Sequence, residues 1–313
     1  MTWFSAFPVL AAATVAAASP ELPTTLPTPD DAEMIKLQQE RNERVTVPVT
    51  IKGQGPFRFM VDTGAQATVV SSDLAERLGL TDRSPAILVG IVSKAAVETT
   101  GIPEFSLGGR EFYIQTAPIV EADNIGGADG ILGLDSLQDQ RVLIDFHKER
   151  IYVSDAKAVA NNRGYEIVVK ARRKLGQLII TGARLNGVDV DVIVDTGSQG
   201  SVGNMALLGQ LSRMHQRGDD TMTDVNGHEL TAAVHIGKKL EISNMALNDI
   251  PIMFTESPTF ETLGMDDRPA LILGINALRL FRRVAIDFAK QQVLFDLPRG
   301  VRERESMIGA IVG

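Results

Sequence analysis

Hydrophobic residues in this chain occur in short runs that are separated by turns containing glycine, asparagine or proline. In the first half, the runs Val45–Ile51 and Phe57–Val61 flank a glycine-containing turn. In the second half, Leu178–Arg184 and Val188–Val194 flank Asn186-Gly187, a pair that favours a two-residue hairpin turn because both turn positions need positive φ. The pattern therefore predicts a β-hairpin at the start of each half.

Each predicted hairpin is followed by one short helix. In the first half Ser72 is the expected N-cap and Gly79 the expected end, and in the second half the helix is expected over Asn204–Met214. Because helices are short and turns are frequent, the expected fold class is all-β, built as two similar lobes. The strands expected to close the halves are Val142–Phe146 and Arg150–Val153 in the first, and Val284–Phe288 and Gln292–Phe295 in the second.

The same motif ends both predicted hairpins. Asp62-Thr63-Gly64-Ala65 follows the first, and Asp195-Thr196-Gly197-Ser198 follows the second. A second motif of apolar residues and glycine comes later in each half, as Ile131-Leu132-Gly133-Leu134 and as Leu271-Ile272-Leu273-Gly274-Ile275. Because the order and spacing of the motifs agree between the halves, the chain is predicted to contain an internal repeat.

The N-terminus has the character of an export signal. Residues Trp3–Ala18 are apolar apart from Ser5 and Thr14, and Ala16-Ala17-Ala18 offers a small-residue cleavage site, although no Lys or Arg precedes the apolar run. The run is short for a membrane span, but an uncleaved anchor stays open as an alternative. We therefore expect an exported protein, periplasmic or secreted, that meets a membrane only through this segment if it is retained.

The predicted domain organisation follows from these features, since at 313 residues each half is long enough to bury its own core. The expected segments are a signal peptide over residues 1–18, a linker over 19–34, a first lobe over 35–155, an interlobe linker over 156–164, a second lobe over 165–298 and a tail over 299–313.

Composition excludes several classes of function. The net charge of −8 and the isoelectric point of about 5.1 argue against nucleic acid as a partner, because phosphate binding needs a basic face. The absence of cysteine excludes disulfides, thiolate metal sites and a cysteine nucleophile. The four histidines lack metal-binding spacing, and the chain has no serine-hydrolase elbow, phosphate loop or dinucleotide fingerprint. No metal or cofactor is therefore expected.

Two aspartates, one from each half, suit a symmetric acid–base pair. An aspartate at the end of a buried strand is costly to ionise, and two brought together repel as dianions, so the pair holds one proton. One carboxylate can then accept a proton from water while the other donates to a substrate carbonyl. A single Asp-Thr-Gly is usually only a turn after a strand, whereas the doubled and ordered pattern is much more specific. The sequence therefore predicts that Asp62 and Asp195 act together.

With its two Asp-Thr-Gly loops and their later apolar-apolar-Gly segments, the chain resembles the pepsin and retropepsin clan of aspartic proteases between Val45 and Pro298. It is similar to two retropepsin-sized units fused in tandem, as in exported bacterial aspartic proteases of the retropepsin-like type. The resemblance implies a bilobal acid-protease fold, with two similar β-barrel-like lobes and a few short helices, that works as a monomer. It also implies a role for each motif residue: catalysis for Asp62 and Asp195, hydrogen bonds across the axis for Thr63 and Thr196, loop shaping for Gly64, Ala65, Gly197 and Ser198, and strand packing behind the loops for Gly133 and Gly274.

The resemblance further implies flaps, which are hairpins that fold over the substrate. The expected flaps are Ile87–Glu98, turning near Ser93, and Thr221–Val234, turning at Asn226-Gly227. The first lacks the tyrosine typical of the pepsin flap and the glycine-rich tip of the retroviral flap. The implied partner is an extended polypeptide substrate, bound through main-chain hydrogen bonds.

One difference between the two motif loops predicts an asymmetry. Ser198 stands where the first loop has Ala65. A Ser198 hydroxyl bonded to the outer oxygen of Asp195 would favour the ionised form of Asp195, leaving the shared proton more often on Asp62.

The expected function is an exported aspartic endopeptidase. The alternatives left open are a non-catalytic peptide-binding module on the same fold, a duplicated β-domain whose pair has lost activity, and a membrane-anchored form.

Overall fold

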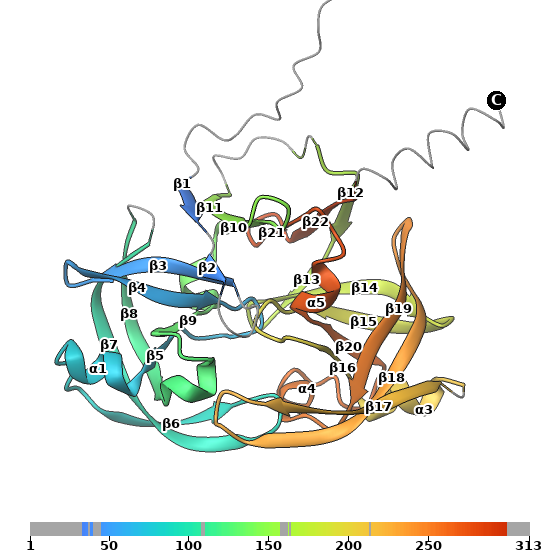
Figure 1. Ribbon diagram of the computed structural model, residues 1–313, viewed down its shortest axis with the longest axis horizontal. Coiled ribbons are helices and arrows are strands. Elements are labelled where there is room, and N and C mark those ends of the chain that lie inside the picture. Colours follow the sequence, from blue (N-terminus) through green and yellow to red (C-terminus); the bar gives the residue numbers. More distant parts are fainter. Residues whose placement is uncertain are drawn as a thin grey trace, which may run out of the picture.

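The computed structural model describes residues 33–36, 38–39, 45–107, 110–156, 162, 164–212 and 214–298. These residues form three β-sheets and five short α-helices, which confirms the all-β fold class. Two of the sheets build one lobe each, and the third joins the lobes along the upper edge of the molecule in Figure 1.

The first lobe is a closed β-barrel. Its sheet would be open at both ends, but β7 pairs back onto β3 and closes a ring of six strands. Two further strands extend this ring, with β2 (Gln38–Gln39) pairing on β3 and β6 (Ser84–Val89) pairing on β7. The strands of the ring, in order, are β3 (Val45–Ile51), β4 (Gln54–Val61), β9 (Gly130–Leu132), β5 (Val69–Ser71), β8 (Arg110–Val120) and β7 (Lys94–Leu107).

The second lobe repeats this arrangement strand for strand. Here β18 pairs back onto β14 and closes the ring, while β13 (Arg172–Lys174) and β17 (His215–Thr223) extend it. The prediction of two similar β-barrel-like lobes is thus confirmed. The strands of the second ring are β14 (Gln177–Leu185), β15 (Val188–Val194), β20 (Ala270–Leu273), β16 (Ser201–Gly203), β19 (Met245–Phe254) and β18 (Glu229–Ile242).

The third sheet joins the lobes through the closing strands of each half. Its central pair is β10 (Gln140–Asp145) from the first half and β21 (Arg283–Asp287) from the second, which run antiparallel with Leu143 opposite Ala285. The outer strands are β11 (Arg150–Asp155) and β1 (Glu33–Lys36) on one side, and β22 (Gln292–Asp296) and β12 (Ile167–Lys170) on the other. Because each half supplies the same pair of strands around this centre, the sheet relates the two lobes by an approximate two-fold axis.

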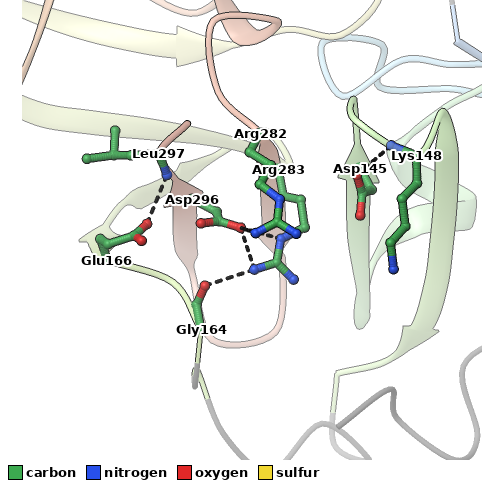
Figure 2. Close-up of polar contacts among 8 residues, drawn as sticks. All are labelled: Asp145, Lys148, Gly164, Glu166, Arg282, Arg283, Asp296 and Leu297. Atoms are coloured by element: carbon green, nitrogen blue, oxygen red, sulfur yellow. Dashed lines mark hydrogen bonds and ion pairs between the residues drawn. The ribbon is translucent and has the colours of Figure 1, made fainter. Parts of the chain in front are cut away.

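A buried ion pair stabilises the strands that the second half of the chain contributes to this sheet. Asp296, which is fully buried, accepts bonds from the Arg283 guanidinium, including one from Nε at 2.5 Å, and the same guanidinium donates to the Gly164 carbonyl at 2.9 Å (Figure 2). Removing one partner of such a pair would leave an uncompensated buried charge, at a cost of about 3–5 kcal/mol. The ion pair therefore holds the chain near Gly164, where the second half begins, against the end of β22.

One hydrophobic core runs through both lobes and the joining sheet. In the first lobe Phe59 and Phe105 meet edge to face, with ring centroids 5.2 Å apart. Next to the joining sheet Phe281 packs on Phe295, with ring centroids 4.7 Å apart. A continuous core keeps the lobes in one fixed relation, and this relation determines the geometry between their loops.

The helices lie near the predicted positions, with one corrected cap. Helix α1 (Ser72–Arg77) is capped by the Ser71 hydroxyl, which accepts from the Leu74 N–H, so the prediction of Ser72 as N-cap is wrong by one residue. Helix α3 (Met205–Gln210) is capped by Asn204 and ends before the predicted Met214. The remaining helical turns are η1 (Ala122–Ile125), α2 (Leu134–Leu137), α4 (Pro258–Thr262) and α5 (Ile275–Leu278).

Some sequence predictions concern residues outside the described part. The signal peptide over 1–18, the tail over 299–313 and most of the interlobe linker lie there. Strand β1 begins at Glu33, two residues before the predicted start of the first lobe at residue 35. In the part of the chain that is described, no helix has the length and apolar character needed to cross a lipid bilayer.

Candidate active site

The two Asp-Thr-Gly loops begin where β4 ends in the first barrel and where β15 ends in the second. Strand β4 lies parallel to β9, and β15 lies parallel to β20. The Asp62 N–H donates to the Leu132 carbonyl at 3.1 Å, and the Asp195 N–H donates to the Leu273 carbonyl at the same distance. Each aspartate is therefore placed by the later apolar strand of its own half, which explains why the two motifs recur together.

The two carboxyl groups face each other across the axis. A Cβ atom built on Gly64 would lie 2.5 Å from Asp195 Cγ, and one built on Gly197 would lie 2.2 Å from Asp62 Cγ. Each carboxyl thus rests on the glycine of the opposite loop, where no side chain fits. The structure brings the predicted pair together.

Backbone N–H groups hold one oxygen of each carboxyl. Asp62 Oδ1 accepts from Gly64 at 2.8 Å and from Ala65 at 2.9 Å. Asp195 Oδ1 accepts from Gly197 at 2.8 Å and from Ser198 at 3.1 Å. These bonds orient both carboxyl groups in the same way, with Oδ1 held by the backbone of its own loop.

The environment keeps a proton on the pair. Burial raises the pKa of Asp195 well above its usual value, and the charge of Asp62 raises it further, while the N–H groups of Ser198 and Gly197 oppose the rise. Burial and the neighbouring charge thus both favour the protonated form of Asp195.

The two threonines bind the loops to one another. The Thr63 N–H donates to Thr196 Oγ1 at 3.1 Å, and the Thr196 N–H donates to Thr63 Oγ1 at 3.1 Å. Each hydroxyl in turn donates to a carbonyl of the opposite strand, Thr63 to Val194 at 2.9 Å and Thr196 to Val61 at 2.7 Å. Both threonines are buried, so these four bonds form a closed network between the lobes.

Gly133 and Gly274 lie one residue beyond the strands where they were predicted. They are the N-caps of α2 and α5, at the point where the chain passes behind each motif loop. A Cβ on Gly133 would be 2.4 Å from the Ala67 carbonyl oxygen, and one on Gly274 would be 2.2 Å from the Gly200 carbonyl oxygen. Close backbone approach, as expected, is what requires glycine at both positions.

The Ser198 hydroxyl does not bind the aspartate pair, contrary to the sequence prediction. It donates to the Gly200 carbonyl at 2.8 Å and closes a local turn, and only the Ser198 N–H reaches Asp195. The asymmetry predicted from this hydroxyl is therefore wrong.

Two hairpins, one from each lobe, meet along the lower side of Figure 1. Flap 1 consists of β6 and β7 with the turn Gly90–Ser93, and flap 2 consists of β17 and β18 with the turn Asp224–His228. Both predicted flaps are thus hairpins, with Ser93, Asn226 and Gly227 in their turns.

The flap tips are hydrogen-bonded to each other through Asp224, which is buried. One of its oxygens accepts from the N–H and the hydroxyl of Ser93, at 2.9 and 2.7 Å. Its other oxygen accepts from the N–H groups of Asn226 and His228, each at 3.0 Å, and Asn226 Nδ2 donates to Ser93 Oγ at 3.0 Å. Asp224 could not be singled out from the sequence, because its partner Ser93 lies in the other lobe.

Each flap tip also packs on the opposite lobe. Ile91 of flap 1 joins a buried cluster of the second lobe, around Phe260 and Ile272, and its carbonyl accepts from the Ser257 hydroxyl at 2.6 Å. Val225 of flap 2 joins the matching cluster of the first lobe. The tip of each flap is therefore held by the opposite lobe, and together the flaps cover the site.

A cavity of about 1370 Å³ lies between the aspartate pair and the flaps. Asp62 and Asp195 line it, together with residues of the edge strands β6 and β17. Over the described residues, no group of three or more histidine, aspartate or glutamate side chains is arranged to hold a metal ion.

A sequence profile described as aspartyl protease matches residues 47–136 and 181–277. The chain belongs to the aspartyl protease family. Each matched region contains one Asp-Thr-Gly loop and its later glycine motif, so this aspartyl protease is a tandem of two retropepsin-like units. A search of curated proteins found no match to the chain.

Proposed function

We propose that this aspartyl protease is an endopeptidase that hydrolyses peptide bonds with a water molecule activated by Asp62 and Asp195. The observation that carries the proposal is the close approach of two carboxyls from opposite lobes, each lying against the glycine of the other's loop, where both line one large cavity. Two carboxyls in contact cannot both ionise at neutral pH, so the pair supplies an acid and a base at once.

The reaction follows from this division of roles. The ionised carboxylate takes a proton from water, and the water oxygen attacks the peptide carbonyl carbon. The protonated carboxyl donates its proton to the carbonyl oxygen, giving a neutral tetrahedral diol. The proton taken from water then passes to the peptide nitrogen as the C–N bond breaks, and the proton of the second hydroxyl returns to the pair. No covalent intermediate with the protein is needed.

The proposed substrate is an extended segment of polypeptide. Strands β6 and β17 are the outermost strands of their sheets, so their free edges can pair with a peptide that lies in the cavity. The flap tips must separate to admit an unbroken chain, because Asp224 and Ser93 join them across the cavity. Both aspartates are on one chain, which supports a monomeric enzyme.

Export of the protein is a further part of the proposal. It rests on the apolar segment Trp3–Ala18 and the small residues at its end. N-terminal sequencing of the mature protein tests it. A protein that begins after Ala18 supports export with cleavage, and one that retains the segment in a membrane fraction supports the anchored form.

The test of function is digestion of a diverse peptide library between pH 3 and pH 8, read by mass spectrometry. The Asp62→Asn and Asp195→Asn variants serve as matched controls, because each keeps the shape of the side chain and removes one ionisable group. We expect internal cleavage by the wild type and none by either variant. Peptide binding without cleavage by all three proteins would instead identify a non-catalytic peptide-binding module.

A further inference from the structure

A buried glutamine contacts the loop that carries Asp62. Gln177 is the first residue of β14 in the second lobe, is only 3% exposed, and lines the cavity of the aspartate pair. Its Nε2 donates to the Gly64 carbonyl of the first lobe at 2.5 Å. Its Oε1 is buried and has no hydrogen-bond partner among the described residues. The side chain therefore makes one polar contact, and that contact is to the motif loop.

The bond from Gln177 continues through one peptide unit to Asp62. The Gly64 carbonyl that accepts from Gln177 belongs to the same peptide as the Ala65 N–H, which donates to Asp62 Oδ1 at 2.9 Å. A peptide whose carbonyl accepts a hydrogen bond is polarised, and its N–H becomes a better donor. A stronger donor stabilises the ionised form of the carboxylate that accepts from it.

Among the described residues, the equivalent peptide in the second lobe has no such donor behind it. The Ser198 N–H donates to Asp195 Oδ1 at a longer distance, 3.1 Å. Within the described ranges, no group donates to the carbonyl of Gly197. The two motif loops thus donate to their aspartates in the same pattern, and among the described residues they differ in the contact behind the Gly64–Ala65 peptide.

We propose that Gln177 is a positioning residue that makes the aspartate pair asymmetric. Through the Gly64–Ala65 peptide it favours ionised Asp62, so that Asp62 is the base that takes the proton from water and Asp195 is the acid that carries the shared proton. This inference rests on the proposed function. It reverses the assignment that the sequence suggested from the Ser198 hydroxyl.

The burial of Gln177 has a stability cost that supports this role. A buried amide oxygen without a partner costs about 1–3 kcal/mol, and a methionine of similar size would fill the same space without that cost. The bond to Gly64 is what the amide provides and methionine does not. It also comes from the lobe of Asp195 and acts on the loop of Asp62, so it links the two halves of the site directly.

Other charged groups around the cavity are arranged on the flaps and the outer loops. They are Asp123 on η1, Arg217, Asp219 and Asp220 on β17, Asp224 in the flap 2 turn and Asp249 on β19. All of them stay in place when Gln177 is replaced. A change in the pH profile on that replacement therefore reports on the aspartate pair and not on the lining of the cavity.

The test is the pH dependence of kcat/KM for the full-length wild type and for Gln177→Met, measured with a fluorogenic peptide that contains a sequence cut in the library. The acidic limb reports the carboxylate that must be ionised in the free enzyme. We expect Gln177→Met to move this limb to higher pH by about half a unit, since one polarising bond is lost. Gln177→Glu, which places a second acid against the Gly64 carbonyl, should move it further in the same direction.

The matched control is Gln140→Met, because Gln140 is also a buried glutamine with an unpartnered Oε1 but belongs to the joining sheet. It should leave the acidic limb unchanged. If Gln177→Met and Gln177→Glu lower the rate at every pH without moving the limb, Gln177 is only structural and the inference is wrong. If the wild type cleaves nothing, or if cleavage survives Asp62→Asn, the proposed function itself is overturned, and the inference with it.

Discussion

Replacing Thr196 by valine should separate the two motif loops without changing the shape of the side chain. The Thr196 hydroxyl donates to the Val61 carbonyl at 2.7 Å and accepts from the Thr63 N–H at 3.1 Å. Both of those partners belong to buried residues. Valine would therefore leave one donor and one acceptor unpaired, at about 1–3 kcal/mol each, so we expect the free energy of unfolding to fall by about 2–6 kcal/mol.

The control is Thr196→Ser, which keeps the hydroxyl and removes one methyl group, for an expected loss of about 1 kcal/mol. The assay is urea unfolding of both variants, followed by cleavage of the same peptide under conditions where each is fully folded. We expect Thr196→Val to lose most of its kcat, since its carboxyls are no longer held in register, and Thr196→Ser to keep most of it. Equal stability of the two variants, within about 0.5 kcal/mol, would refute the reasoning.

Two further predictions concern the proton of the pair and the flaps. Because the pKa of Asp195 is raised, the folded protein binds more protons than the unfolded chain above about pH 4, and its stability falls as the pH rises from there to the folded pKa. Asp195→Asn should therefore have a larger free energy of unfolding than the wild type at pH 7, by about 1.4 kcal/mol per unit of raised pKa. This advantage should disappear near pH 4. A difference in stability that does not change with pH would contradict the prediction. Asp224→Ala should release the flap tips and speed hydrogen exchange at the Ser93 and His228 amides by about tenfold or more. The exposed control Asp219→Ala should leave these exchange rates unchanged. Equal exchange in both variants would show that Asp224 does not hold the flaps.

The elements that the sequence predicts well are those fixed by neighbouring residues. The Asn186-Gly187 turn dictates the hairpin of β14 and β15, and both turn residues have positive φ, as that turn type requires. Each Asp-Thr-Gly loop could be placed because it directly follows a buried strand. Closure of the barrels could not be predicted, since the pairing of β3 with β7 joins Ile51 to Phe105 and depends on no local signal.

The candidate site shows the same division between local and distant contacts. The repeated motif predicted Asp62 and Asp195, and the Asn226-Gly227 pair predicted the turn of flap 2. Gln177 could not be found in this way, because its partner Gly64 is 113 residues away and a lone glutamine at the start of a strand carries no signal. The Ser198 prediction failed because its hydroxyl donates to the Gly200 carbonyl in its own turn.

The central claim is that the two carboxyls work as one unit, and the measurement that tests it most directly is the kcat of Asp62→Asn, Asp195→Asn and the double variant on one cleaved peptide. If each carboxyl is needed for the role of the other, the two single variants should lose as much activity as the double variant, down to the level without enzyme. A single variant that keeps a tenth of the wild-type rate, or losses that multiply in the double variant, would contradict the account.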